Sequence, residues 1–247
     1  MKPVATIPTL LVFTLGPENE RSRRRLLPTP LGRAETALHR SGLERMLAIG
    51  HAAGCRVVVA APEPLDLPAG VTQLLQRGSS FGMRLRDAVC KQRTAIGDAP
   101  LLVVGTDTPD LEAAHLLAAI GRLADDCDSV VVGPSVDGGF YLLACRIGVD
   151  EALAAVHWRR RDACRSLLTA LHRAGHPVHL LEELLDLDHR ADLERWLTRR
   201  RTGTPVSWLE RWLWTVLAAW RRPVVQLVFG CPDLALAAVV FGRGPPC

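Results

Sequence analysis

The sequence predicts an α/β protein, a three-layer sandwich built around a mostly parallel central sheet. Short apolar runs rich in β-branched residues recur along the chain and are typical of strands buried on both faces. Stretches with helical spacing of apolar residues separate these runs, as strand–helix–strand units require. Turn signals made of glycine and proline lie between them. The predicted strands are residues 10–15, 56–60, 71–75, 101–104, 128–134, 140–144 and 177–181.

Helices are predicted between most of these strands. Their expected ranges are residues 34–52, 81–91, 111–123, 150–157, 162–174 and 190–198. The first strand is expected to lead into an arginine-rich loop, in which guanidinium groups replace the glycine-rich backbone that commonly binds phosphate in such folds. Asp137-Gly138-Gly139 predicts the turn of a hairpin whose second strand is the run at 140–144.

Size and composition are those of a folded globular protein. The chain has 247 residues, 23% of them charged and 48% apolar, which suffices for one large domain or a domain of about 200 residues with an appendage. The net charge of +4 arises from arginine clusters at 21–25, 159–161 and 199–201. We interpret the last two as solvated surface. No aromatic residues interleave with the clusters, which argues against a nucleic-acid partner.

The cysteines and the N-terminus indicate a cytoplasmic protein. Seven cysteines are scattered without a CxxC pair or zinc-ligand spacing, and several lie in apolar surroundings typical of small core residues. The apolar run near the N-terminus is interrupted by Pro3 and Pro8 and has no small-residue cleavage site after it, so it does not match a signal peptide.

One carboxylate stands where a buried strand ends. Leu101–Val104 is followed by Gly105-Thr106-Asp107, and ligands of open α/β sheets bind at the carboxyl ends of the strands. Asp107 is therefore well placed to hold a divalent cation against a phosphorylated ligand, because Mg²⁺ takes one or two carboxylates together with phosphate oxygens. The alternative is that Asp107 caps the helix that follows.

A second acidic cluster comes late in the chain. Asp186 and Asp188 alternate with leucines, so an extended backbone projects both carboxylates to one side. Like charges this close repel each other unless a cation or proton intervenes. With Asp107 they would form a set suited to one or two Mg²⁺ or Mn²⁺ ions. The alternative makes Asp188 a helix N-cap and Asp186 a solvated loop residue.

Three segments together resemble a known family from residue 10 to about residue 196. The chain is similar to CofC-like bacterial transferases of the glycosyltransferase-A (GT-A) fold, the nucleotide-diphospho-sugar transferase fold, long known as a domain of unknown function. The most specific matching segments are residues 104–111, 133–143 and 186–193. Weaker matches are residues 21–28, 76–78, Gly82, 84–85 and Trp158.

The resemblance implies a Mg²⁺- or Mn²⁺-dependent transfer from a nucleoside triphosphate or nucleotide sugar to a small-molecule acceptor. It implies Asp107, Asp186 and Asp188 as metal ligands, and Asp107 with Arg25 as the catalytic residues. Arg23 and Arg25 match basic positions that face the donor phosphates, and Asp137-Gly138-Gly139 would shape the acceptor side. The substrate-binding residues that it implies are Arg21, Arg23, Arg25, Gln76, Gly78, Asp137, Gly138, Gly139 and Trp158.

The chain departs from the family pattern after its first strand. Leu15 stands where a basic or polar residue is usual, and Glu20 where glycine is expected near a polyphosphate. A carboxylate there would repel the donor. The departure supports an alternative function, a degenerate and non-catalytic nucleotide-binding or scaffolding member of the same fold. His189 replaces the family's threonine and is either a further nitrogen ligand or a surface residue.

The C-terminal end is a separate region. A GT-A-like domain is predicted at 1–200 and an apolar helical extension at 205–247, which holds four of the six tryptophans. A glycine-proline break near residue 231 makes the extension a poor membrane span. Packing against the domain or a second subunit as a homodimer, contact with a membrane surface, and disorder stay open. Membrane contact would place the protein at the inner face of the membrane.

Overall fold

The structure, a computed structural model, describes residues 6–24, 26 and 32–200. The chain divides after Trp196 into two units, and the fold and site below belong to the first, Met1–Trp196. Arg25 and the predicted extension at 205–247 lie outside the described residues. The predicted domain boundary at 200–205 stays a prediction.

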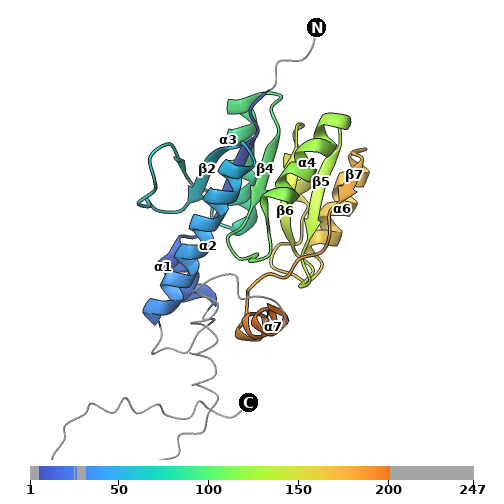
Figure 1. Cartoon of the computed structure of the whole chain (residues 1–247). Coiled ribbons are helices and arrows are strands. Elements are labelled where there is room, and N and C mark those ends of the chain that lie inside the picture. The colour runs from blue at the N-terminus through green and yellow to red at the C-terminus, as the bar shows by residue number, and fades with distance from the viewer. Residues whose placement is uncertain (1–5, 25, 27–31, 201–247) are drawn as a thin grey trace, which may run out of the picture. The chain divides into compact units, whose positions relative to one another are not determined.

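A seven-stranded sheet forms the middle layer (Figure 1). Its strand order is β3-β2-β1-β4-β6-β5-β7, and β6 alone runs antiparallel to its neighbours. The predicted mostly parallel sheet and the predicted hairpin between β5 and β6 are therefore confirmed. The strands are β1 (Thr9–Phe13), β2 (Arg56–Ala61), β3 (Thr72–Leu75), β4 (Leu101–Val104), β5 (Val130–Pro134), β6 (Phe140–Cys145) and β7 (Val178–Leu180).

Helices cover both faces of the sheet, as the predicted three-layer sandwich requires. Side chains alternate along each strand, so Leu10 and Val12 face α2 and α4 while Leu11 and Phe13 face α3, α5 and α6. The described helices are α1 (Pro17–Arg24), α2 (Gly32–Ala52), α3 (Phe81–Ile96), α4 (Ala113–Asp125), α5 (Asp150–Ala154), α6 (Ala163–Arg173) and α7 (Arg190–Arg200).

Two local predictions, for the segment after β1 and for the start of α4, are wrong. The segment after β1 is the helix α1 and not a loop, because Pro17 starts the helix. Glu18 and Glu20 lie in its first turn, where the partial positive charge of the helix dipole stabilises carboxylates. The helix α4 starts at Ala113, two residues later than predicted, with Glu112 as its N-cap. Asp107 is therefore not the cap of that helix.

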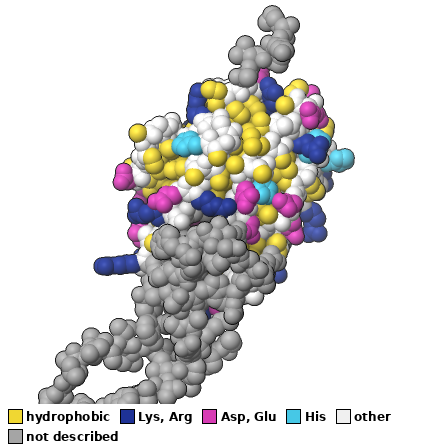
Figure 2. Space-filling model, in the orientation of Figure 1, with side chains coloured by type: hydrophobic (Ala, Val, Ile, Leu, Met, Phe, Trp, Pro, Cys, Tyr) yellow, Lys and Arg dark blue, Asp and Glu magenta, His cyan; other side chains and the backbone are white. Residues whose placement is uncertain are grey.

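The described surface is mixed in character. On the face that Figure 2 shows, charged side chains of both signs are dispersed among apolar ones. None of the helices in the described part of the chain combines the length and apolar composition that crossing a bilayer requires. The five cysteines that the structure describes are all free thiols.

Candidate active site

A cavity of about 960 Å³ opens at the carboxyl ends of β1 and β4. Because these strands are parallel neighbours, both end at the same edge of the sheet, where the antiparallel β6 begins. The β5–β6 turn, residues 158–161 and residues 185–195 supply the other walls. The cavity lining includes eight residues of the predicted site, namely Arg23, Asp107, Asp137, Gly138, Gly139, Trp158, Asp186 and Asp188.

Asp107 lies on the first turn beyond β4. Its carboxylate folds back over Gly105, where a Cβ atom would collide with the Asp107 Oδ1 atom. Glycine at residue 105 thus permits close approach of the carboxylate to the strand end, and a side chain there would displace it. The side chain remains half-buried on the cavity wall.

Asp186 is brought beside Asp107 from 79 residues along the chain. The Leu187 N–H donates to the Asp107 carbonyl at 2.9 Å, and the Thr108 hydroxyl donates to Asp186 Oδ1 at 2.5 Å. Removal from water, followed by the charge of Asp107, raises the pKa of Asp186 to about 8. The alternative in which Asp186 is a solvated loop residue is therefore wrong.

The pair fits a divalent cation without a complete protein cage. Among the described residues, no group of three or more His, Cys, Asp and Glu side chains is arranged to hold a metal ion. Mg²⁺ usually keeps only one or two protein carboxylates and takes substrate phosphate oxygens and water for the rest. Asp107 and Asp186 meet that requirement. Both carboxylates are partly buried, and like charges at these two positions repel each other. Asp188 is half-buried on the same cavity wall.

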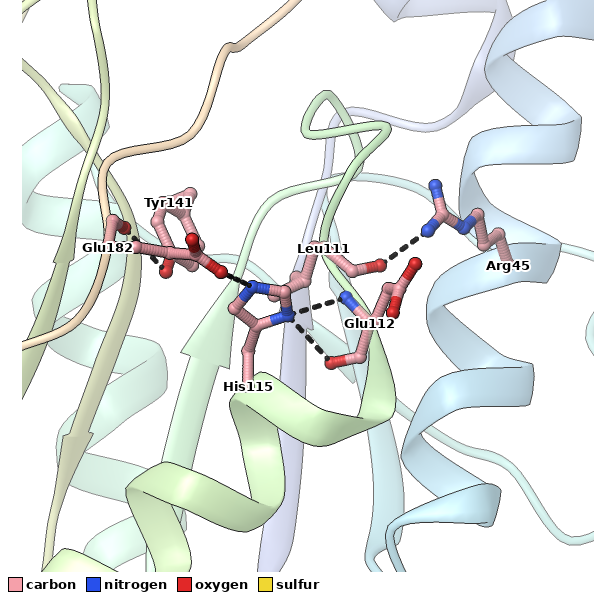
Figure 3. Close-up of polar contacts among 6 residues, drawn as sticks. All are labelled: Arg45, Leu111, Glu112, His115, Tyr141 and Glu182. Atoms are coloured by element: carbon pink, nitrogen blue, oxygen red, sulfur yellow. Dashed lines mark hydrogen bonds and ion pairs between the residues drawn. The ribbon is translucent and has the colours of Figure 1, made fainter. Parts of the chain in front are cut away.

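A network around Glu182 holds the segment that carries Asp186 (Figure 3). The Tyr141 hydroxyl donates to the Glu182 carbonyl at 3.0 Å, and the Glu182 carboxylate lies 2.7 Å from His115 Nε2. The other ring nitrogen of His115 accepts the Glu112 N–H at 3.0 Å. Burial, with the nearby Glu182 charge, raises the pKa of Tyr141, so its hydroxyl stays a donor. No local pattern marks His115, whereas Tyr141 lies in the matching segment 133–143, which carries no predicted role for it.

The same segment is also attached to β5. The Leu184 N–H donates to the Pro134 carbonyl at 3.1 Å, and the Leu184 carbonyl accepts the Val136 N–H at 3.0 Å. These bonds run from the end of β5 into the β5–β6 turn. The late acidic segment is thus bonded to β5 and β6 and to the residues after β4.

Glu20 is turned into the loop between β1 and α1. Its side chain is 4% exposed, and Oε1 accepts the Leu15 N–H at 3.0 Å and the Thr14 hydroxyl at 3.4 Å. The carboxylate therefore takes a backbone N–H of the segment in which such folds commonly bind phosphate. It also orders that segment, because the Gly16 N–H donates to Thr14 Oγ1.

Three predicted substrate-binding residues are absent from the cavity lining. Arg21 pairs with Glu18 at 3.6 Å on the surface of α1. Gln76 is buried, and its amide donates to the Thr14 and Ala60 carbonyls at 2.8 and 2.9 Å, which ties the ends of β1 and β2 together. Gly78 is exposed on the loop before α3. Gln76 thus has a structural explanation that its sequence context did not reveal.

An aromatic cluster forms one wall. The ring of Trp158 lies 5.2 Å from that of Phe81 and 5.9 Å from that of Phe140, and its Nε1–H donates to the Leu153 carbonyl at 3.2 Å. A ring held on several sides provides a fixed apolar surface in the cavity.

Arg159, Arg160 and Arg161 follow this ring and also line the cavity, as do His189 and Arg195. The sequence predicts a solvated surface for the 159–161 cluster. Its side chains are exposed, yet they border the cavity because the Trp158 ring fixes the chain there. The adjacent Trp158, which the resemblance singled out, was the available signal.

The β5–β6 turn is packed against the arginine segment. Gly138 has a φ of +90°, and a Cβ atom at this position would collide with the Arg161 carbonyl. The Gly138 carbonyl accepts the Cys164 N–H at 2.9 Å, and the Asp137 carboxylate accepts the Gly139 N–H at 2.8 Å. The turn and the segment 159–161 therefore form one wall.

Comparison with solved structures shows the same fold. A protein of Desulfovibrio desulfuricans G20, provisionally assigned as a nucleotide-diphospho-sugar transferase, superimposes with a TM-score of 0.73 at 20% identity, covering 85% of this chain and 95% of that one. A 4-diphosphocytidyl-2C-methyl-D-erythritol synthase gives a TM-score of 0.52 at 15% identity, with 81% and 100% covered. A homologue of Mycobacterium tuberculosis Rv0371c from Mycobacterium sp. strain JC1 gives 0.52 at 18% identity, with 79% and 98% covered.

These likenesses show that the chain has the GT-A, nucleotide-diphospho-sugar transferase-like fold that its motifs predicted. No curated protein matched the chain. The sequence profile of one bacterial family matches residues 34–160, from α2 to the arginine segment, which is just over half of the chain. The chain therefore belongs to the family described as uncharacterized proteins conserved in bacteria, DUF2064.

Proposed function

We propose that the protein is a Mg²⁺- or Mn²⁺-dependent transferase that moves a glycosyl or nucleotidyl group from a nucleotide-activated donor to a small acceptor. The observation that carries this proposal is the juxtaposition of Asp107 and Asp186 on the wall of a large cavity at the sheet edge. The fold shared with a provisionally assigned nucleotide-diphospho-sugar transferase and with a diphosphocytidyl-methylerythritol synthase supports a nucleotide-activated donor.

The chain's own residues have separable roles in this proposal. Asp107 and Asp186 hold the cation, with Asp188 near it on the same wall. Arg23 lines the cavity on the α1 side and orients the donor phosphates. Arg25, which lies outside the described residues, is proposed as its partner in that role. The Trp158 ring offers an apolar surface against which a planar or sugar ring can pack.

The reaction needs no covalent enzyme intermediate. A bound Mg²⁺ would neutralise donor phosphate charge and stabilise the leaving group. An acceptor oxygen forms a bond to the α-phosphorus as the bond to pyrophosphate breaks, or to the sugar carbon as the bond to a nucleoside diphosphate breaks. The leaving group keeps the bonding pair, and the proton of an acceptor hydroxyl passes to water. Asp107, Asp186 and Arg23 contribute by holding the reactants in line.

Glu20 favours a second candidate, a non-catalytic nucleotide-binding or scaffolding protein. Its carboxylate already accepts a hydrogen bond from the Leu15 N–H, and it would repel a polyphosphate brought to the same loop. Under this candidate, ligands bind the cavity without the aid of a metal ion.

The test is a calorimetric titration of the full chain with nucleoside triphosphates and nucleotide sugars, with and without Mg²⁺ or Mn²⁺. We expect binding that requires the metal and that falls by tenfold or more in Asp107→Asn, because an amide is a far weaker ligand for a hard cation than a carboxylate. Asp125→Asn, on the exposed end of α4, makes the same chemical change outside the cavity and is the control.

Two results would decide against the proposal. Binding of equal strength without metal would favour the non-catalytic candidate. Metal-dependent binding that Asp107→Asn leaves unchanged would remove Asp107 from the site, and with it the assigned chemistry.

A further inference from the structure

We propose that Arg159 and Arg161 form an anion site for the acceptor, and that the acceptor carries a phosphate group. This inference rests on the proposed function and names the substrate class of its second reactant. The arginines lie in the second half of the chain, next to Trp158, and they border the cavity that Asp107 and Asp186 also line.

The backbone at Arg159 is held in an unusual conformation. Its φ is +63°, the only positive φ of a non-glycine residue in the described part of the chain. This conformation is strained for a residue with a Cβ atom and persists only where its surroundings dictate it. Strain of this kind is concentrated at ligand-binding sites, so the conformation supports a binding role for this segment.

Contacts on both sides dictate that conformation. Before it, the Trp158 ring is packed on Phe81 and Phe140, and the Trp158 N–H donates to the Val156 carbonyl at 3.0 Å. After it, the Ala163 N–H donates to the Arg160 carbonyl at 3.1 Å. The Arg161 carbonyl lies against Gly138, which has no side chain to displace it. The segment is therefore a preorganised element of the wall and not a loose surface loop.

The three arginines of the segment differ in whether they form an ion pair. Arg160 lies 3.7 Å from Asp162, which neutralises it in part. No ion pair joins Arg159 or Arg161 to a carboxylate of the described residues, and both side chains are exposed. Two uncompensated guanidinium groups at the edge of a cavity match the charge of a phosphate dianion and can each donate two hydrogen bonds to it.

The proposed function assigns the donor to other residues of the cavity, Asp107, Asp186 and Arg23. In the loop after β1, the Leu15 N–H already donates to Glu20. Arg23 and Arg195 also line the cavity, but Arg23 is assigned to the donor, so Arg159 and Arg161 are the neighbouring pair of cations that remains for a second anion. A volume of about 960 Å³ is at the upper end for a single small ligand, which leaves room for two reactants.

The experiment measures binding of inorganic phosphate to the full chain by calorimetry, without metal or nucleotide and at matched ionic strength in chloride. We expect the double variant Arg159→Gly/Arg161→Ala to lose phosphate affinity by about tenfold or more. Glycine at 159 removes the guanidinium while accepting the positive φ, so the fold should survive. Arg165→Ala/Arg173→Ala removes two exposed charges from α6 outside the cavity and should bind phosphate as the unaltered chain does.

A second measurement separates the acceptor from the donor. With saturating Mg²⁺ and nucleotide, phosphate should still bind to the unaltered chain, and the double variant should keep its metal-dependent nucleotide affinity within about twofold. Parallel loss of nucleotide and phosphate binding, or displacement of phosphate by nucleotide, would assign the arginines to the donor and overturn the inference. Equal phosphate affinity in the double variant and the α6 control would also overturn it.

The outcome also distinguishes this inference from the proposed function. If nucleotide binding proves independent of metal while phosphate binding still needs Arg159 and Arg161, the anion site stands and the transferase proposal fails, along with the acceptor role. If metal-dependent nucleotide binding is present and phosphate binding ignores the arginines, the transferase proposal stands and the anion site fails.

Discussion

Asp107 and Asp186 lie beside each other on the cavity wall, and the charge of Asp107 disfavours a second negative charge on Asp186. The folded state binds a proton at Asp186 more tightly than the unfolded chain does, because burial and the charge of Asp107 raise its pKa from 3.8 to about 8. The free energy that this proton contributes to folding is fully present below the unfolded pKa and is lost as the pH rises through the folded pKa.

We predict that the metal-free protein loses stability between about pH 4 and pH 8 through this residue. In Asp186→Asn that loss should vanish, so the difference in unfolding free energy between variant and unaltered chain should grow with pH. Urea denaturation at several pH values measures it, with Asp125→Asn as the control. Added Mg²⁺ should stabilise the unaltered chain most at high pH. Parallel pH curves for the two proteins would show that Asp186 has no raised pKa.

Glu20 has contacts that its sequence context does not reveal. The sequence predicts a carboxylate near a polyphosphate, and Glu20 does line the cavity, but its Oε1 also accepts the Leu15 N–H and the Thr14 hydroxyl. Helix formation by Pro17–Arg24 determines these contacts, because it places Glu20 one turn after the loop it contacts. The residue therefore shapes the loop after β1 through these hydrogen bonds.

Among the elements, the segment after β7 depends most on its neighbours. It has little regular structure from residue 181 to 189, yet it carries two of the predicted metal ligands. The first turn of α4 holds it through His115 and Glu182, and β6 holds it through Tyr141 (Figure 3). The helix α4 and the strand β6 thus position Asp186 indirectly, through their contacts with Glu182.

His115→Ala should loosen this segment without unfolding the domain. The change removes the ring nitrogen that contacts Glu182 and the one that accepts the Glu112 N–H, so we expect a stability loss of about 1 kcal/mol. Metal-dependent nucleotide affinity should fall severalfold, because Asp186 is less firmly placed. Hydrogen exchange at the Leu184 and Leu187 amides should accelerate, whereas amides of β1 should not.

His172→Ala, at the exposed end of α6, is the matched control for that experiment. Unchanged exchange at Leu184 and Leu187 in His115→Ala would mean that the bonds to Pro134 and Asp107 suffice to hold the segment. His115 would then have no positioning role.

At the scale of the whole molecule, all of the described residues that line the cavity belong to the unit Met1–Trp196. A chain that ends at Thr204 should therefore bind nucleotide with metal as strongly as the full chain does. Calorimetry on both chains measures this, and a severalfold loss in the shorter chain would assign the region after residue 204 to the site.

Flotation of the same two chains with anionic vesicles tests membrane contact by the region after residue 204. Equal flotation of the two chains would exclude that contact.

Much of the architecture could be predicted because its determinants are local. The β-branched runs that end at Phe13 and Val104 are buried on both faces, and the Asp-Gly-Gly turn joins two antiparallel strands, as their spacing predicted. Asp107 at the end of β4 followed from the same local pattern. The ends of helices were less predictable, as α1 and the start of α4 show, because a cap such as Glu112 is one residue within a polar stretch.

The sequence by itself determined the layers, the direction of the strands and the acidic strand end, since apolar periodicity and turn residues specify burial and reversal within a few residues. Only the tertiary structure decided that Asp186 lies beside Asp107, that Arg159 and Arg161 border the cavity and that Glu20 faces its own loop. These contacts depend on the paths of loops and on packing between distant elements, and a local pattern carries no information about either.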